Sequence, residues 1–232
     1  NVLRFGGEVM KNVAGYDVSR LLAGSLGVLG ALVEVSLKVV PRPRREATCV
    51  LALDESSALD QCLRWRSRPL PVSATAWVAD ASGAGGKLSV RLSGNESAVR
   101  QGLEEIGGEH LDDEAADAFW LGMRDQTHAF FRQQPLWRIV LPAGAPALGL
   151  APVLHEWGGC LRWLAGPHDA AALRDRVQSL GGSACLYRRD GAPADVPAFH
   201  PLADGVLQIH RRLKQEFDPA GIFNAHRLYP EL

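Results

Sequence analysis

Two stretches of the sequence, ESAVRQGLEEIGG at residues 96–108 and AAALRDRVQSLGG at residues 170–182, carry most of the information about the fold. Each has an apolar stripe at positions i, i+4 and i+7 followed by a glycine pair, which predicts an amphipathic helix with a left-handed C-cap. The match indicates either a duplicated βαβ unit or two independent helices with the same cap. The pairs, each 74 residues apart (99 to 173), are Val99 with Leu173, Leu103 with Val177, Ile106 with Leu180, Gly107 with Gly181 and Gly108 with Gly182.

Around these helices, residues 46–199 alternate between short strand-like runs and helical runs. The predicted fold class is α+β: an antiparallel, ferredoxin-like and possibly duplicated sheet with helices packed on one face. The predicted strands are 48–53, 73–79, 87–92, 136–141, 161–164 and 184–187, and the predicted helices are 56–66, 96–106, 114–131 and 169–180.

Two further zones flank this region. Residues 1–43 contain a predicted strand in which Val33, Val35, Leu37 and Val39 alternate with polar residues, and they end in a proline-rich linker. Residues 200–232 contain a predicted helix with an apolar stripe, which Asp218-Pro219 stops. The apolar tail after this helix is expected to pack on the first zone. Residues 32–40 are expected to be covered either by this tail or by a dimer contact.

The composition is that of an ordinary globular protein, with 47% hydrophobic and 22% charged residues. A net charge of -1 predicts no nucleic-acid partner, and the chain lacks an apolar run of the ~20 residues that a membrane span needs. Four scattered cysteines are typical of reduced thiols in the cytoplasm. The chain starts without Met on a strand-like segment, which is expected of a portion cut from a larger protein.

Glycines recur at every third position in LLAGSLGVLG, residues 21–30. A backbone that passes close to the phosphates of a dinucleotide needs residues without Cβ, and its free N–H groups then face the anion. Ser25 adds a hydroxyl donor. Taken alone, the spacing favours a tight turn between a short helix and a buried strand, because the G-x-G-x-x-G fingerprint is absent.

The wider segment resembles the end of the FAD-binding domain in the vanillyl-alcohol-oxidase/p-cresol-methylhydroxylase superfamily. There, a G-Y-D-[LV]…L-x-x-G-S-x-G-x-L-G pattern leads into a strand beside the flavin nucleotide. The tail FDPAGIFN, residues 217–224, resembles the F-D-P-x-x-[IL]-[FL]-N segment that closes these proteins. Residues 5–12 and 130–138 look most like the FAD-binding subunits of bacterial glycolate oxidases.

The resemblance implies an FAD-dependent oxidoreductase subunit. Residues 1–43 would be the end of a PCMH-type FAD-binding domain, 46–199 a cap domain, and 200–232 a helix and tail that return to the FAD domain. The implied partners are a sister flavoprotein subunit, an iron–sulfur subunit and, for the whole complex, a small 2-hydroxy acid, with any membrane association made through the complex. The implied cofactor-binding residues are Gly15, Tyr16, Asp17, Gly24, Ser25, Gly27, Val28, Gly30, Val33 and Asn224.

Two departures from the family pattern shape the functional hypotheses. The glycine-rich half that grips the FAD pyrophosphate has no counterpart here, so this stretch by itself is expected to hold no FAD. The H-x-G-D-G-N-x-H string of relatives that oxidise 2-hydroxy acids is also missing, which leaves catalytic residues unassigned and predicts no metal site. The leading hypothesis is an FAD-holding or electron-relaying subunit. The alternatives are a non-catalytic scaffold for a catalytic sister subunit and a self-sufficient flavin oxidase of another alcohol.

Overall fold

The computed structural model describes residues 2–5, 18–80 and 85–232. The chain divides into two compact units. Unit 1 combines Asn1–Val40 with Pro201–Leu232, and unit 2 is Pro41–His200.

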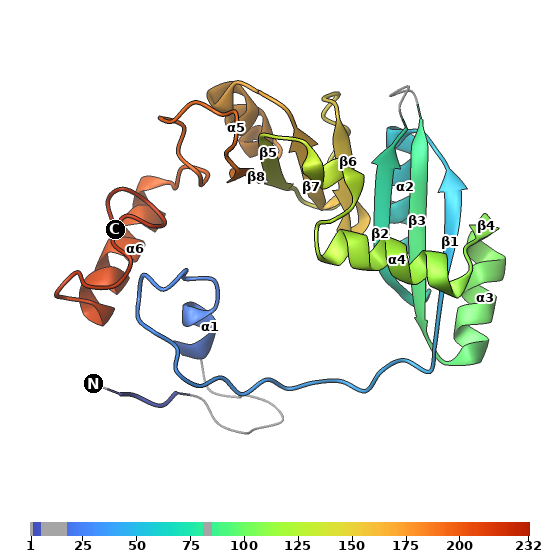
Figure 1. Cartoon of the computed structure of the whole chain (residues 1–232), viewed down its shortest axis with the longest axis horizontal. Helices are drawn as coiled ribbons and strands as arrows, with labels where there is room; N and C mark the ends of the chain where they lie inside the picture. The colour runs from blue at the N-terminus through green and yellow to red at the C-terminus, as the bar shows by residue number, and fades with distance from the viewer. Residues whose placement is uncertain (1, 6–17, 81–84) are drawn as a thin grey trace. The chain divides into compact units, whose positions relative to one another are not determined.

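Unit 2 contains an eight-stranded antiparallel sheet in the order β4-β1-β3-β2-β6-β7-β5-β8 (Figure 1). The antiparallel α+β class is therefore confirmed, and all six strands predicted within residues 46–199 are present. Two strands were missed, because two and four residues are too short for an alternating pattern to be recognised. The strands are β1 Arg45–Ala52, β2 Val72–Ala79, β3 Gly86–Gly94, β4 Glu109–His110, β5 Leu136–Val140, β6 Val153–Glu156, β7 Leu161–Ala165 and β8 Ser183–Arg188.

The sheet consists of two halves with the same topology. In β1–β4 the spatial order is fourth, first, third, second, and in β5–β8 it is the same order read from the opposite edge. Each half is thus a ferredoxin-like unit, and the halves meet through their second strands, β2 and β6. The structure supports the duplication rather than a chance match of two helices.

Equivalent contacts recur in the two halves. α3 (Glu96–Ile106) and α5 (Ala170–Ser179) each join a third strand to a fourth. Asn95 caps α3 by accepting from the Ala98 amide at 2.8 Å, and Asp169 caps α5 by accepting from the Ala172 amide at 2.7 Å. After each helix the second glycine lies against the first strand of its own half. A Cβ at Gly108 would overlap the carbonyl oxygen of Val50, and one at Gly182 would overlap that of Val140.

The prediction that all helices lie on one face was wrong for one helix. α2 (Glu55–Trp65), α3 and α5 pack on the face that carries Trp77 and Trp137. α4 (Asp113–Arg124) and the 3-10 turn η1 (Ala129–Arg132) pack on the opposite face, and Figure 1 shows α4 crossing in front of the strands. This segment must run from the edge strand β4 to the other half of the sheet, and the three helices already cover the first face. The single helix predicted over 114–131 is therefore a helix, a turn and a 3-10 segment.

The second half lacks a counterpart of α2. The irregular segment between β5 and β6 takes its place, with Ala145 and Leu148 buried in the core. Arg162 of β7, 1% exposed, holds this segment: its guanidinium donates to the carbonyl oxygens of Ala145 (2.6 Å), Pro146 (2.6 Å) and Gly159 (3.0 Å). A buried arginine thus supplies donors that bind a non-helical backbone.

A polar row crosses the junction of the two halves. Only Ala76, Trp77 and Val78 of β2 pair with β6. Along this row, Trp77 lies opposite His155 of β6, which in turn lies opposite Arg162 of β7. His155, 3% exposed, lies 2.9 Å through Nε2 from the Glu55 carboxylate of α2, and its ring centroid is 5.4 Å from that of Trp77. Burial lowers the pKa of His155 below its usual 6.5, although Glu55 opposes the shift. The folded protein therefore keeps this ring neutral near pH 7.

Unit 1 contains α1 (Val18–Leu22) and α6 (Asp204–Phe217) among its described residues. The strand predicted at 33–39 is extended but pairs with no described strand, and Val33, Leu37 and Val39 are more than 80% exposed. Its alternating pattern did not lead to a buried face, since no described element covers either side.

We expect Arg162→Met to lower the free energy of unfolding by about 2–4 kcal/mol, because three carbonyl groups lose their donor. Arg176→Met, at an exposed position on α5, is the matched control and is expected to change it by less than about 0.5 kcal/mol. Urea denaturation measures both. Equal effects of the two substitutions would show that the bonds of Arg162 contribute nothing.

We also expect the unfolding free energy to fall as the pH is lowered through 6.5. The unfolded chain then binds a proton that buried His155 does not, with a limiting slope of about 1.4 kcal/mol per pH unit. His128 and His200, whose pKa values are also lowered by burial, contribute in the same direction. The His155→Phe variant should show a shallower pH dependence than the parent protein, and parallel curves would contradict this assignment.

Candidate cofactor-binding loop

The loop after α1 is built from consecutive turns. The Ser25 amide donates to the Leu22 carbonyl oxygen and the Val28 amide to that of Ser25, both at 3.1 Å. Gly24 (φ +83°) and Gly27 (φ +76°) adopt the left-handed conformation that these turns require. Val28 and Leu29 are buried and anchor the end of the loop.

Several backbone amides in this loop have no acceptor among the residues that the structure describes. The amides of Leu26, Gly27 and Gly30 donate to no described residue, and a Cβ at Gly30 would meet nothing within 4 Å. Gly27 and Gly30 are partly exposed. Free N–H groups on a backbone without side chains are the elements that bind an anion such as a phosphate.

The C-terminal segment is bound to this loop through Lys214 of α6. Its ammonium group donates to the carbonyl oxygens of Val28 (2.8 Å) and Phe223 (2.6 Å) and to the carboxylate of Asp218 (2.6 Å). Asp218, 5% exposed, also accepts from the amides of Ile222 (3.0 Å) and Phe223 (2.8 Å). The hydrogen bond from Lys214, together with these amides, lowers the pKa of Asp218 to about 2.

Asn224 makes a second connection between the tail and the loop. Its side-chain amide donates to the Leu26 carbonyl oxygen at 2.7 Å, and a Cβ on Gly27 would lie 2.8 Å from the same nitrogen. The two motifs at opposite ends of the sequence therefore meet. The predicted docking of the tail on the first zone is confirmed, but its partner is the loop 26–28 rather than residues 32–40.

The structure brings together most of the described candidate residues. Gly24, Ser25, Gly27, Val28 and Gly30 share the loop, and Asn224 lies against it. Val33 is 84% exposed on the extended segment beyond the loop.

Gly15, Tyr16 and Asp17 lie outside the described residues. Lys214 and Asp218 were missed as organising residues, although an i, i+4 cation–carboxylate pair at the end of a helix is a recognisable signal.

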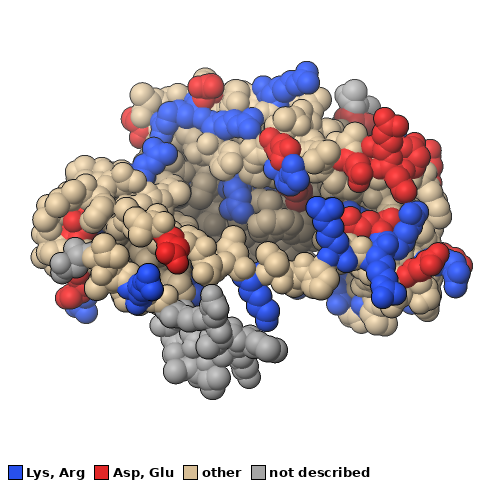
Figure 2. Space-filling view, turned by 60° about the horizontal axis from the view of Figure 1, so that its bottom comes forward, with Lys and Arg blue, Asp and Glu red and all other residues tan. Residues whose placement is uncertain are grey.

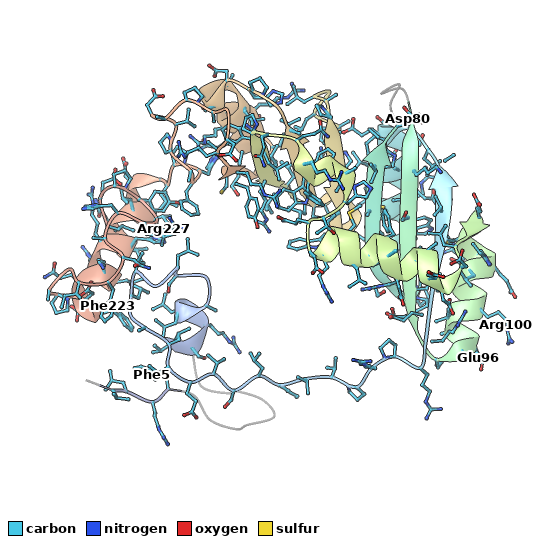
Figure 3. The ribbon with its side chains drawn as sticks, in the orientation of Figure 1. Phe5, Asp80, Glu96, Arg100, Phe223 and Arg227 are labelled. Carbon is cyan, nitrogen blue, oxygen red and sulfur yellow. The ribbon has the colours of Figure 1, made fainter. Side chains whose placement is uncertain are left out.

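Apolar side chains remain exposed around this site. Ile222 is 74% exposed, Ile209 57% and Leu26 47%, so the expected cover over Ile222 is not formed by the described residues. Phe223, labelled in Figure 3, is 37% exposed. Exposed apolar groups beside free amides are what one wall of a larger binding site presents.

Unit 2 carries a separate polar and aromatic cluster on the face that α4 occupies. The Trp163 indole donates to the Glu156 carboxylate at 2.6 Å, and burial raises the pKa of Glu156. The Arg138 guanidinium lies 5.6 Å from the ring centroid of Trp157. The face drawn in Figure 2 carries acidic and basic side chains together, without a field of a single sign.

No family model matches the chain. It is 41% identical over 233 residues to the glycolate oxidase subunit GlcE of Escherichia coli (strain K12), covering 99% of the chain and 62% of that protein. Nearly the whole chain is thus similar in sequence to a glycolate oxidase subunit. A further match is 46% identity over 56 residues with the glycolate oxidase subunit GlcD of Bacillus subtilis (strain 168), covering 24% of the chain and 12% of that protein.

The resemblance inferred from the sequence motifs is thus confirmed. The chain spans about three fifths of the length of GlcE.

We expect Gly27→Ala to destabilise unit 1 more than Gly24→Ala does. Both glycines have positive φ, which costs an alanine about 1–2 kcal/mol. Only at Gly27 does the new Cβ also collide with Asn224, adding about 1–3 kcal/mol, whereas nothing lies within 4 Å at Gly24. Hydrogen exchange of the amides in the loop and tail measures the difference, and equal protection in the two variants would refute the Asn224 contact.

Proposed function

We propose that this chain forms part of an FAD-binding subunit of a glycolate oxidase complex. The observation that carries the proposal is the glycine loop with its free amides, bound to the C-terminal motif through Lys214 and Asn224. The relationship to GlcE supports the same assignment.

The loop would hold the phosphate end of FAD. The amides of Gly27 and Gly30 and the Ser25 hydroxyl are donors suited to it, and the open space beside Gly30 allows a close approach. Gly15, Tyr16, Asp17, Gly24, Val28, Val33 and Asn224 complete the proposed set. When bound, FAD would supply the redox chemistry, while this chain positions it and excludes water on one side.

Unit 2 would serve as the cap of the flavin site, and the subunit would relay electrons rather than oxidise the 2-hydroxy acid itself. The missing histidine string in the sequence supports this division of labour. The proposed partners are a sister flavoprotein subunit and an iron–sulfur subunit.

All four cysteines are free, which supports a reducing, cytoplasmic compartment. Among the described residues, no helix has both the length and the apolar character of a bilayer span.

The test is the flavin content of the full-length protein, co-purified with its complex and measured by visible absorbance. We expect Gly30→Val to lose most of the flavin because a branched side chain blocks the backbone approach. Gly205→Val, at another glycine of unit 1 with nothing within 4 Å, should keep it. Full flavin occupancy in Gly30→Val would remove the loop from the flavin site.

Ser25→Ala provides a second test of FAD binding by the loop, without a change of backbone conformation. Loss of one hydroxyl donor to a charged group should weaken FAD binding about tenfold. Ser36→Ala, in the exposed extended segment, is the control. A parent protein without any flavin would favour the scaffold hypothesis.

A further inference from the structure

Half of strand β2 has an open edge at the centre of the sheet. β2 has eight residues, and its pairs with β6 run only from Ala76 to Val78. Beyond Glu156 the chain leaves the sheet through three successive residues with positive φ: Trp157 (+53°), Gly158 (+64°) and Gly159 (+84°). No described strand pairs with Val72–Ala74 on that side. A tryptophan in this conformation is strained, and such strain is retained where the surrounding structure uses it.

A groove of about 930 Å³ follows this open edge. Because α2 and α4 pack on opposite faces of the sheet, Trp65 and Arg66 from the end of α2 form one wall and Trp120 and Leu121 from α4 form the other. The amide of Gly158 donates to Thr75 Oγ1 at 2.7 Å and closes one end. The groove thus continues the plane of the sheet, where an added strand would lie.

The groove is lined by more basic than acidic groups. It contains the side chains of Arg66, Arg68, Arg91 and Arg124 but only those of Asp117 and Glu156 on the acidic side. The Glu156 carboxylate is already engaged by Trp163.

Arg68 pairs with Glu105 at 2.9 Å, and Arg91 donates to Ser73 Oγ at 3.0 Å and lies 3.7 Å from the Glu46 carboxylate. The other two arginines, Arg66 and Arg124, are only weakly engaged. Arg124 pairs with its neighbour Asp125, both well exposed, and such surface pairs contribute little. Within the described part of the chain, the Arg66 guanidinium makes one polar contact, at 3.7 Å to the sulfur of Cys160. These guanidinium groups are therefore available to carboxylates of a ligand.

Apolar side chains supply anchoring positions beside the charges. Trp157 is 59% exposed and Leu121 47% exposed, and both line the groove. Exposed tryptophan and arginine around a concave surface are typical of residues that dominate protein–protein binding energy. A small 2-hydroxy acid would occupy only a small part of this volume.

We propose that this groove binds an extended, acidic segment of a partner protein, which adds to the open edge of β2 as a strand. The four residues Val72–Thr75 offer about 13 Å of strand at ~3.3 Å per residue. Main-chain hydrogen bonds would provide affinity, and the arginines would select carboxylate side chains. The proposal does not depend on flavin binding by unit 1.

The test uses the parent chain and a fluorescein-labelled peptide, acetyl-Thr-Glu-Val-Glu-Val-Glu-Thr-amide, in a polarisation titration. We expect saturable binding, and a loss of at least about tenfold when lysines replace the glutamates. Peptides N-methylated at alternate residues, one for each side of the strand, separate main-chain pairing from charge. One of the two should also lose at least about tenfold, because one side of the peptide must bond to β2.

Protein variants locate the site. Arg66→Glu combined with Arg124→Glu should weaken the acidic peptide and favour its lysine counterpart. Arg100→Glu is the matched control: it is exposed on α3 one turn after Glu96 and points away from the sheet (Figure 3).

Several results would overturn the proposal: no binding at about 1 mM peptide, equal binding of the acidic and basic peptides, full binding of both N-methylated peptides, or equal effects of the groove and control variants. Complete displacement of the peptide by glycolate at low millimolar concentration would instead assign the groove to a small carboxylate.

Discussion

The integrity of unit 2 depends on a narrow seam between two half-sheets. Three residues of β2 face three of β6, and so few ladder pairs leave most of the joining to side chains. Glu55 reaches from the helix of the first half to His155 in the second, and Arg162 beside it binds the backbone that stands in for a helix. Burial disfavours charge on both His155 and Arg162, so the row depends on the contact of His155 Nε2 with Glu55 and on the three hydrogen bonds of Arg162, while His155 Nδ1 has no partner among the described residues.

Much of the fold was predictable because each half repeats local signals. The helix stripes, the glycine pairs and the alternating strands all depend on contacts within a few residues or on one buried face. The missed features have longer-range causes. α4 lies on the second face because the chain must cross the sheet, and the helix before β6 is replaced because Arg162 satisfies an irregular backbone from a distant strand. Neither cause leaves a periodic pattern in the sequence.

In the candidate cofactor loop, too, local features were predictable from the sequence and long-range contacts were not. The spacing of Gly24, Gly27 and Gly30 indicated a backbone with room for close approach, and the structure adds that the room beside Gly27 is taken by Asn224. The sequence signals the pairing of Lys214 with Asp218 at i, i+4, but not the contacts of Lys214 with the Val28 and Phe223 carbonyl oxygens, which only the folded chain brings together. The alternating residues 33–39 show the converse error: a strand pattern predicts burial only where another element supplies the cover.

The duplicated sheet also has a consequence for stoichiometry. Two ferredoxin-like halves that meet through equivalent strands resemble a twofold dimer, in which any surface at the seam occurs twice. Fusion into one chain allows the copies to diverge. The first half contains α2, whereas the second has an irregular segment in its place, and its chain leaves the sheet after Glu156. The seam is therefore asymmetric. A true dimer would have two open strand edges there, whereas one chain has a single open edge and so a single place for an added strand.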